Sequence, residues 1–257
     1  MVLLFFYFYL FKNNCSMNNK VFIENSELRT KFIQFLSDFI YERRVSQLQK
    51  VIEFRTKYIT VVLEDIFQSQ NASAVLRTSD CLGIQNVHII ENKNRFNINP
   101  KVVLGSAKWL TIKKYNGNSN NSEKAIKKLK DEGYRIVATS PHTNQISLDQ
   151  FDINKGKVAV FLGTEQTGLS ETVLKQADEY LTIPMFGFTE SYNISVSAAI
   201  VLYDLTKKLR ESNISYQLSK DEQEILILTW LKGITKNYEM MEKRFLHENK
   251  IEINKKY

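Results

Sequence analysis

The sequence predicts an α/β fold with a mostly parallel β-sheet, flanked on both sides by short helical arms. In the middle of the chain, β-branched apolar runs of strand length alternate with amphipathic segments of helix length. Towards both ends the apolar residues recur only at helical spacing. With 43% of its 257 residues hydrophobic and 25% charged, the chain can bury one sizeable core and smaller appendages.

The first helical arm is predicted from residue 26 to about residue 54. Its apolar side chains, among them Leu28, Phe32 and Leu36, fall at helical spacing. The period then changes, because residues 58–63 (YITVVL) form a β-branched run that is typical of a buried strand. We expect the central domain to begin there.

Helices and strands alternate through the central domain. Gly83 and Gly133 follow two helical patterns at the place where a left-handed residue commonly ends a helix. A C-terminal helical arm is expected over residues 219–246. These patterns divide the chain into a helical arm at 17–57, a central domain at 58–210 and a second helical arm at 211–257. Within the central domain, helices are expected at 71–82, 122–132 and 194–209, and strands at 58–63, 86–90, 109–115, 134–139, 158–162 and 180–183.

Residues 1–11 are apolar and aromatic throughout. This run is too short to span a bilayer, which takes about 20 residues, and it lacks the basic start and the cleavage site of a secretory signal. We expect residues 1–16 to be a disordered extension or a mis-assigned start, since Met17 follows, with a weak membrane anchor as the alternative. Removing them should leave folding and activity intact.

Charge is distributed unevenly along the chain, which carries a formal net charge of +7. Residues 20–58 hold eight Lys/Arg and five Asp/Glu, residues 59–205 hold fifteen of each, and residues 206–257 hold eleven and eight. A neutral middle with basic flanks favours two arms that contact a polyanion, solvated helix faces being the alternative.

Cysteine and histidine are scarce in this sequence. Cys15 and Cys81 are far apart, which fits a reducing compartment, and we expect the protein in the cytoplasm. His88, His142 and His247 stand alone, without the short spacing of zinc ligands. We therefore predict no metal site and no membrane association.

A glycine-rich segment, residues 161–170 (FLGTEQTGLS), follows a predicted strand and precedes a helix. Gly163 and Gly168 have the spacing of a phosphate-binding P-loop, but Leu169 occupies the position where that loop needs a lysine. A nucleoside triphosphatase is thus disfavoured. The glycines can still let the backbone approach another ligand closely, and Ser170 can cap the next helix.

Four segments, taken together, resemble the SPOUT superfamily of RNA 2′-O-methyltransferases. Residues 71–78 (NASAVLRT) are similar to the first motif of the family. Residues 162–169 (LGTEQTGL), 183–187 (IPMFG) and 191–199 (SYNISVSAA) are similar to its second and third motifs. They occur in order and at family-like spacing over about residues 58–210, and the short helical arms resemble the TrmH group, which modifies the D-loop guanosine of tRNA.

The resemblance implies a trefoil-knotted parallel-sheet domain, S-adenosylmethionine as cofactor, tRNA as substrate with guanosine 18 as its target, and a homodimer. An adenosyl group needs an apolar slot with a few main-chain hydrogen bonds. Two residues depart from the family pattern: Tyr192 stands where Leu is usual, and Gln68 where a Lys commonly precedes the first motif. The cofactor contacts implied by position are Thr139, Leu162, Gly163, Ile183, Met185 and Tyr192.

The resemblance also implies a catalytic set, of which Arg77 is the central member. A guanidinium can polarise a ribose hydroxyl, or hold the adjacent phosphate so that the phosphate accepts the proton. A surface salt bridge is the alternative for Arg77, helix capping or loop geometry for the others. The set is Asn71, Arg77, Glu165, Ser191 and Asn193.

Basic residues at both ends of the central domain are the predicted RNA contacts. Two other functions stay open: methylation of ribosomal RNA, and a catalytically silent RNA-binding module that keeps the fold. The predicted RNA contacts are Arg43, Arg44, Arg55, Lys57, Lys207, Lys208 and Arg210.

Overall fold

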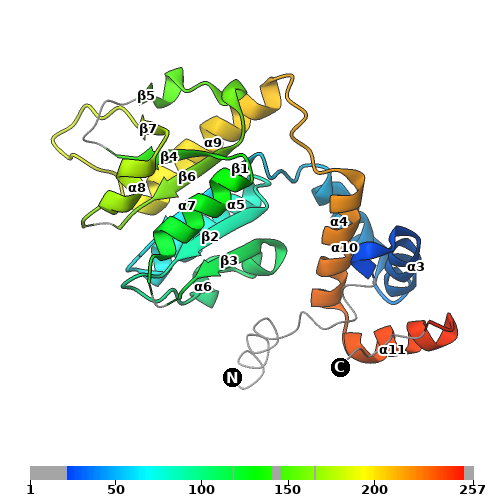
Figure 1. Ribbon diagram of the computed structural model, residues 1–257. Helices are drawn as coiled ribbons and strands as arrows, with labels where there is room; N and C mark the ends of the chain where they lie inside the picture. Colours follow the sequence, from blue (N-terminus) through cyan, green and yellow to red (C-terminus); the bar gives the residue numbers. More distant parts are fainter. Residues whose placement is uncertain (1–21, 118, 141–145, 165, 252–257) are drawn as a thin grey trace. The chain divides into compact units, whose positions relative to one another are not determined.

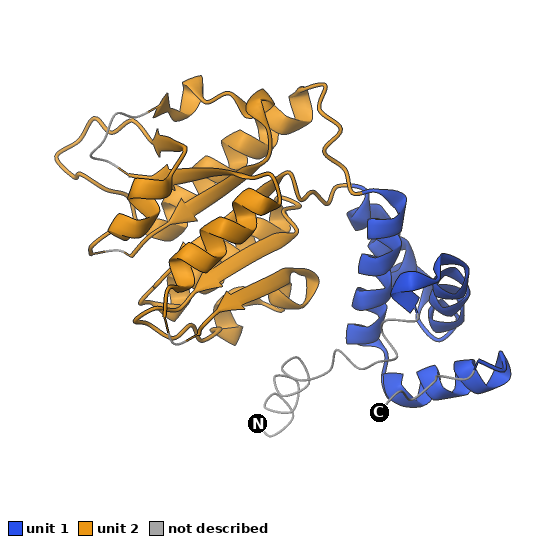
Figure 2. Cartoon of the chain, in the orientation of Figure 1, with its two compact units in different colours: residues 1–53, 219–257 blue, residues 54–218 orange. Residues whose placement is uncertain are grey.

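The computed structural model describes residues 22–117, 119–140, 146–164 and 166–251, which form two compact units (Figures 1 and 2). The sheet unit spans residues 54–218. Among the described residues, the helical unit combines residues 22–53 with residues 219–251.

The sheet unit is built on a seven-stranded sheet with the order β3-β2-β1-β6-β4-β7-β5. Its strand pairs are parallel, so every connection is a crossover, and this confirms the predicted α/β fold with a parallel sheet. The strands are β1 (Ile59–Glu64), β2 (Asn86–Ile90), β3 (Thr111–Tyr115), β4 (Arg135–Thr139), β5 (Ile146–Ser147), β6 (Val158–Leu162) and β7 (Glu179–Thr182).

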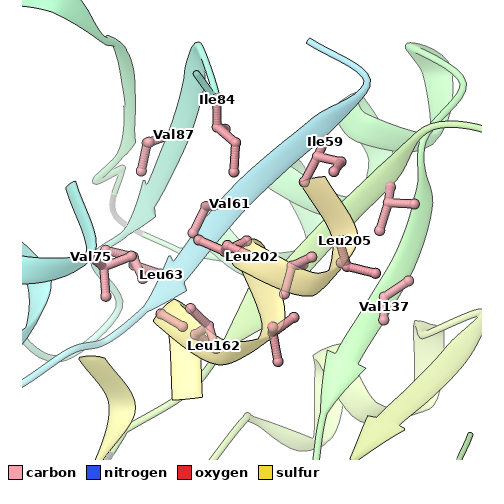
Figure 3. Close-up of a cluster of buried hydrophobic side chains, with 14 of the residues drawn as sticks. Ile59, Val61, Leu63, Val75, Ile84, Val87, Val137, Leu162, Leu202 and Leu205 are labelled. Atoms are coloured by element: carbon pink, nitrogen blue, oxygen red, sulfur yellow. The ribbon is translucent and has the colours of Figure 1, made fainter. Parts of the chain in front are cut away.

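Helices cover both faces of this sheet (Figure 1). On one face, Val61 and Leu63 of β1 share a core with Leu202 of α9, and Figure 3 shows how strand and helix side chains meet there. Val62 points to the other face, into a second core that includes Ile126 of α7. Burial of both faces explains why the strands are continuous apolar runs. The first face carries α5 (Ser69–Cys81) and α9 (Ile194–Glu211), and the second α7 (Asn121–Asp131) and α8 (Glu171–Gln176).

Short elements that the periodicity did not indicate complete the sheet unit. The α-helix α6 (Pro100–Val103) and the 3₁₀ turns η1 (Ser106–Trp109), η2 (Leu148–Gln150) and η3 (Ile153–Lys155) lie in the connections. The two glycines expected to end helices do have left-handed backbones, with φ of 77° at Gly83 and 81° at Gly133. At Gly83 a side chain is also excluded by space, since a Cβ would lie 2.4 Å from the carbonyl oxygen of Phe54.

The helical unit joins both ends of the chain in one body, in which α10 packs against α3 and α4, and α11 against α3. Arg29 of α3 is 1% exposed and forms ion pairs with Asp221 and Glu224 of α10. Its Nη1 donates to the carbonyl oxygens of Phe22 and Ile23, at 3.1 and 3.0 Å. The helices are α3 (Ser26–Ser37), α4 (Glu42–Ile52), α10 (Lys220–Ile234) and α11 (Tyr238–Glu248).

The boundaries of the sheet unit lie outside the predicted 58–210, because residues 54–57 and 211–218 pack with the sheet. Thr56 holds both segments. Its N–H donates to the carbonyl oxygen of Gly83 at 2.9 Å, and its Oγ1 donates to the carbonyl oxygen of Tyr216 at 2.7 Å. The expectation for residues 1–16 concerns a segment outside the described residues. None of the helices in the described ranges is both long and apolar enough to cross a membrane.

Candidate active site at the carboxyl edge of the sheet

The motif segments follow strands that are neighbours in the sheet. Residues 71–78 come after β1, residues 162–169 begin at the end of β6, and Ile183 follows β7, while Thr139 ends β4. Since β1, β6, β4 and β7 are adjacent and parallel, their carboxyl ends lie along one edge of the sheet. In open α/β sheets this is the edge where ligands bind.

A pair of side-chain amides connects the first and third motifs at this edge. Nδ2 of Asn193 donates to Oδ1 of Asn71 at 3.3 Å, and Nδ2 of Asn71 donates to Oε1 of Gln68 at 3.2 Å. Asn193 is also the N-cap of α9, where its Oδ1 accepts from the N–H of Ser195 at 2.9 Å. Helix capping, the alternative considered for Asn71, does not occur: α5 begins before the expected residue 71, Gln68 is its N-cap, and Asn71 is 8% exposed in the first turn.

Arg77 is exposed on α5, six residues after Asn71. Helix geometry separates the two by about 9 Å along the axis and about 120° around it. The nearest acid towards the C-terminus, Asp80, pairs with Arg55 instead. Within the described ranges no hydrogen bond or ion pair engages the Arg77 guanidinium, so the surface salt bridge considered as an alternative is not formed there.

The glycine-rich segment forms a tight loop after β6. The N–H of Thr164 donates to the carbonyl oxygen of Gly168 at 2.9 Å, and the N–H of Gly168 donates back to the carbonyl oxygen of Thr164 at 3.1 Å. A Cβ on Gly163 would lie 2.2 Å from the carbonyl carbon of Gly168, so only glycine fits there. Ser170 caps α8 as predicted, whereas Glu165 lies outside the described residues.

Most of the predicted cofactor residues carry an apolar side chain or, at Gly163, none. Leu162 is buried, Ile183 and Met185 are half-buried, and Tyr192 is exposed. The hydroxyl of Thr139 is already used, because Oγ1 donates to the carbonyl oxygen of Phe161 at 2.8 Å. Ser191, from the third motif, is exposed ahead of α9. This set fits an adenosyl group, which needs apolar contact and main-chain polar groups rather than charged side chains.

Several of the predicted RNA contacts are built into the sheet unit. Arg55 is 2% exposed and paired with Asp80, so we remove it from the predicted contacts. Lys208 forms an ion pair with Asp204, with 2.9 Å between Nζ and Oδ2. Nη2 of Arg210 donates to the carbonyl oxygen of Leu82 at 2.8 Å.

The remaining four predicted contacts are divided between the units. Arg43 and Arg44 belong to the helical unit, Lys57 and Lys207 to the sheet unit. Arg43 and Lys207 are exposed, whereas Arg44 and Lys57 are half-buried. The expectation that the arms alone carry the RNA-binding charge therefore changes, because five of the seven original candidates lie in the sheet unit.

Buried ionisable groups of the sheet unit that were not singled out from the sequence as functional include His88 and Glu64. Nδ1 of His88 lies 3.0 Å from the hydroxyl of Tyr115, inside the sheet unit. Glu64, at the end of β1, is 2% exposed and accepts hydrogen bonds from Ser122 and Ser170. Its only signal in the sequence is a carboxylate that ends an apolar run. No group of three or more His, Cys, Asp and Glu that could hold a metal occurs in the part of the chain that the structure describes.

The fold and the site match known proteins. The model of the SpoU rRNA methylase family matches residues 58–203. The chain belongs to this family. Its membership confirms the resemblance found in the motifs, since the matched range contains all of them.

Several similar proteins match most of this chain. A Borreliella burgdorferi protein named tRNA (guanosine(18)-2′-O)-methyltransferase is 50% identical over 212 residues, 82% of this chain and 95% of its own length. An Aquifex aeolicus protein of the same name is 30% identical over 72% of this chain and 86% of its own length. The crystal structure of the A. aeolicus TrmH/SpoU tRNA modifying enzyme aligns with a TM-score of 0.67 and 28% identity, over 76% of this chain and 98% of that one.

Proposed function

We propose that this SpoU-family chain transfers a methyl group from S-adenosylmethionine to the ribose 2′-hydroxyl of guanosine 18 in tRNA. The contact between Asn71 and Asn193 carries the proposal, because it joins the first and third motifs at the edge where the glycine loop lies. The substrate follows from the Borreliella burgdorferi relative, whose name states this reaction and whose length the chain covers almost completely.

The cofactor would be held by the ends of β4, β6 and β7 and by the segment after β7. Leu162, Ile183 and Met185 supply apolar contact. Gly163 has no side chain, so the cofactor can approach its main chain closely. When bound, S-adenosylmethionine supplies a methyl carbon made electrophilic by its sulfonium. Thr139 and Tyr192 complete the proposed set. The Thr139 hydroxyl is hydrogen-bonded to the main chain of β6, and the Tyr192 ring would form part of the wall of the cofactor pocket.

The substrate hydroxyl would be activated by Arg77. Its guanidinium has no partner within the described residues and presents a fork of donors that matches a phosphate. Holding the phosphate next to the target ribose would place a proton acceptor beside the 2′-hydroxyl. Asn71, Asn193 and Ser191 would position the ribose, and Glu165 stays a proposed member of the set.

A homodimer in the cytoplasm, with a trefoil-knotted sheet domain, is proposed as the working form. Exposed apolar side chains support the dimer, because a surface of this kind favours association with another protein surface. They lie on the segment before α9 and on α9 itself, and they are Phe186, Phe188, Tyr192, Val196 and Tyr203.

The reaction is tested with the purified full-length chain, labelled S-adenosylmethionine and an unmodified tRNA transcript. We expect label at guanosine 18, mapped by resistance of the methylated ribose to alkaline cleavage. A transcript with 2′-deoxyguanosine at position 18 is the control and should accept no label. Label in ribosomal RNA alone would support the alternative substrate, and cofactor binding without transfer to either RNA would support the silent binding module.

A further inference from the structure

Glu64 is a buried carboxylate at the carboxyl end of β1. Its Oε2 accepts from the N–H of Ser170 at 2.8 Å, and its Oε1 accepts from Oγ of Ser170 at 2.8 Å and from Oγ of Ser122. Among the described residues no Lys, Arg or His forms an ion pair with it. Hydroxyl and amide donors therefore compensate this charge, and two of the three bonds come from a single residue.

The partners of Glu64 begin two different helices on the same face of the sheet. Ser122 lies in the first turn of α7, and Ser170 is the N-cap of α8. Ser170 uses its hydroxyl twice, because Oγ donates to Glu64 and accepts from the N–H of Val173 at 3.3 Å. The carboxylate thus fixes the residue at which the glycine loop ends and α8 starts.

Packing alone does not account for a carboxylate at this position. Val62, two residues earlier in β1, faces the same side of the sheet and contributes an ordinary apolar side chain to the core there. Burying a charge is costly unless its hydrogen bonds are satisfied, so the three donors must be held in place for the fold to tolerate Glu64. Conversely, Glu64 restrains those donors.

The bonds inside the glycine loop and the bonds to Glu64 have different effects. The two main-chain hydrogen bonds between Thr164 and Gly168 set the shape of the loop but connect it to nothing else. β6 fixes the start of the loop at Leu162. The end of the loop is fixed to the neighbouring strand β1 by the two bonds from Ser170 to Glu64.

We propose that Glu64 is a positioning residue for the cofactor loop, of which residues 163, 164 and 166–169 are described, and that it sets the affinity for S-adenosylmethionine by fixing the end of the loop against β1. The proposal rests on the function proposed above, because it assumes that this loop holds the cofactor. Ser122 belongs to the same hydrogen-bond set but restrains α7, so its bond should matter for stability and not for cofactor binding.

The proposal is tested by calorimetric titration of S-adenosylmethionine into the full-length protein. In Glu64→Gln one acceptor oxygen becomes an NH₂ donor facing existing donors, so at least one bond is lost at unchanged volume. We expect the affinity to fall about tenfold, the scale of one hydrogen bond to a charged group. The KM for S-adenosylmethionine should rise by a similar factor, with kcat changed less than about threefold and tRNA affinity unchanged.

Three further variants separate positioning from stability. Glu171→Gln is the matched control, since it removes an exposed carboxylate next to Ser170 and should leave cofactor affinity unchanged. Ser170→Ala keeps the N–H bond to Glu64 and loses the hydroxyl bond, so it should weaken cofactor binding by about threefold to tenfold. Ser122→Ala should lower the unfolding temperature while cofactor affinity stays unchanged.

The outcomes distinguish this proposal from the function on which it rests. A wild-type protein that does not bind S-adenosylmethionine overturns the proposed function. If the wild type binds and Glu64→Gln binds equally well, the positioning role is overturned and the function stands. Equal losses of affinity in Ser122→Ala and Ser170→Ala would also overturn it, because they would show a general effect of packing. That pair decides the question even if Glu64→Gln does not fold.

Discussion

Arg29 in the helical unit and Glu64 in the sheet unit are both charged and almost completely buried, but their charges are compensated in different ways. Arg29 faces two acids of opposite charge, Asp221 and Glu224, which lie on the other arm of the chain. Among the described residues, Glu64 faces hydroxyl and amide donors alone, and both donor residues begin helices of its own unit.

The difference shows two uses of a buried charge. The ion pairs of Arg29 connect segments almost two hundred residues apart and join them into one body. Both segments lie outside residues 58–203, which the family model matches. A carboxylate held by hydroxyls fixes a loop in which motif residues lie. Stability should therefore be the main property that Arg29 controls, and ligand binding the main property that Glu64 controls.

The largest expected effect is on the stability of the helical unit. Arg29→Ala should lower the free energy of unfolding of the helical unit by about 3–5 kcal/mol, which is the cost of breaking a buried ion pair. We expect a value near the lower figure, because the partner Asp221 is 63% exposed. The chain has two tryptophans, Trp109 in the sheet unit and Trp230 in the helical unit. Fluorescence during guanidinium unfolding, with Trp109→Phe as background, reports the helical unit.

The matched control for this variant uses the other tryptophan. With Trp230→Phe as background, Trp109 reports the sheet unit, whose transition should not move when Arg29 is replaced. If both transitions move by the same amount, the two units unfold together, and Arg29 does not control the stability of the helical unit alone.

The second effect concerns acid stability and should be confined to the sheet unit. Burial, and next the nearby charge of Lys113, lower the pKa of His88 from 6.5 to about 4. The folded state then binds fewer protons than the unfolded state, so the full contribution to stability is present above about pH 6.5 and is lost as the pH falls towards 4. The loss should reach about 3 kcal/mol, measured by urea unfolding of the Trp109 reporter between pH 7 and pH 4.

His88→Asn is the control for this acid effect. The charged and titratable groups around His88 are Tyr115 and Lys113 of β3, with Lys128 and Glu132 at the end of α7. The variant should be less stable at pH 7, because it gives up a buried contact, but should lose most of the pH dependence. An unchanged slope in His88→Asn would assign the acid sensitivity to other groups.

Sequence periodicity predicted six of the seven strands and the longer helices of the sheet unit, because each of these elements carries its own local signal. Gly83 and Gly133 end helices as expected, and the strand at 86–90 has the predicted bounds. The two-residue strand β5 was missed because so short a segment has no period. The start of α5 was misplaced because Asn71 is a good capping residue, and its amide is instead engaged with Gln68 and Asn193.

Long-range pairs explain what could not be predicted at the site. Nothing near Arg55 in the sequence shows that it is buried, since its acid partner Asp80 comes 25 residues later. Glu64 likewise receives its hydrogen bonds from residues 58 and 106 positions away. The family motifs located Asn71 and Asn193, 122 residues apart, and the structure brings them into contact. Motifs thus carry information about distant pairs that periodicity lacks.

The third effect is on catalysis. Arg77→Ala should slow methyl transfer at least about a hundredfold, the scale of removing a positioned charge stabiliser, while affinity for S-adenosylmethionine changes little. Single-turnover transfer to tRNA at saturating cofactor measures the chemical step. Arg77→Lys is the control: it keeps the charge but loses the planar fork, and should recover only part of the rate. Near-normal turnover in Arg77→Ala would remove it from the catalytic set.

The smallest effect decides which unit contacts the tRNA backbone. Arg43 of the helical unit and Lys207 of the sheet unit are both exposed, so each is free to meet a phosphate. Each true contact that is neutralised should lower the slope of log affinity against log salt by about one, without changing which nucleotide is methylated. Between about 50 and 200 mM salt, the variant should then lose about three- to fourfold less affinity than the wild type.

Comparing the two alanine variants separates the units. Lys127→Ala, on the exposed side of α7 and paired with Asp131, is the control and should leave the slope unchanged. A lower slope for Arg43→Ala alone assigns the backbone contacts to the helical unit, and lower slopes for both variants mean that the two units share the tRNA. If only Lys207→Ala lowers the slope, the helical unit has no part in binding through Arg43. The ion pairs of Arg29 would then stabilise a unit with a structural role, in which the N-terminal and C-terminal segments are held together.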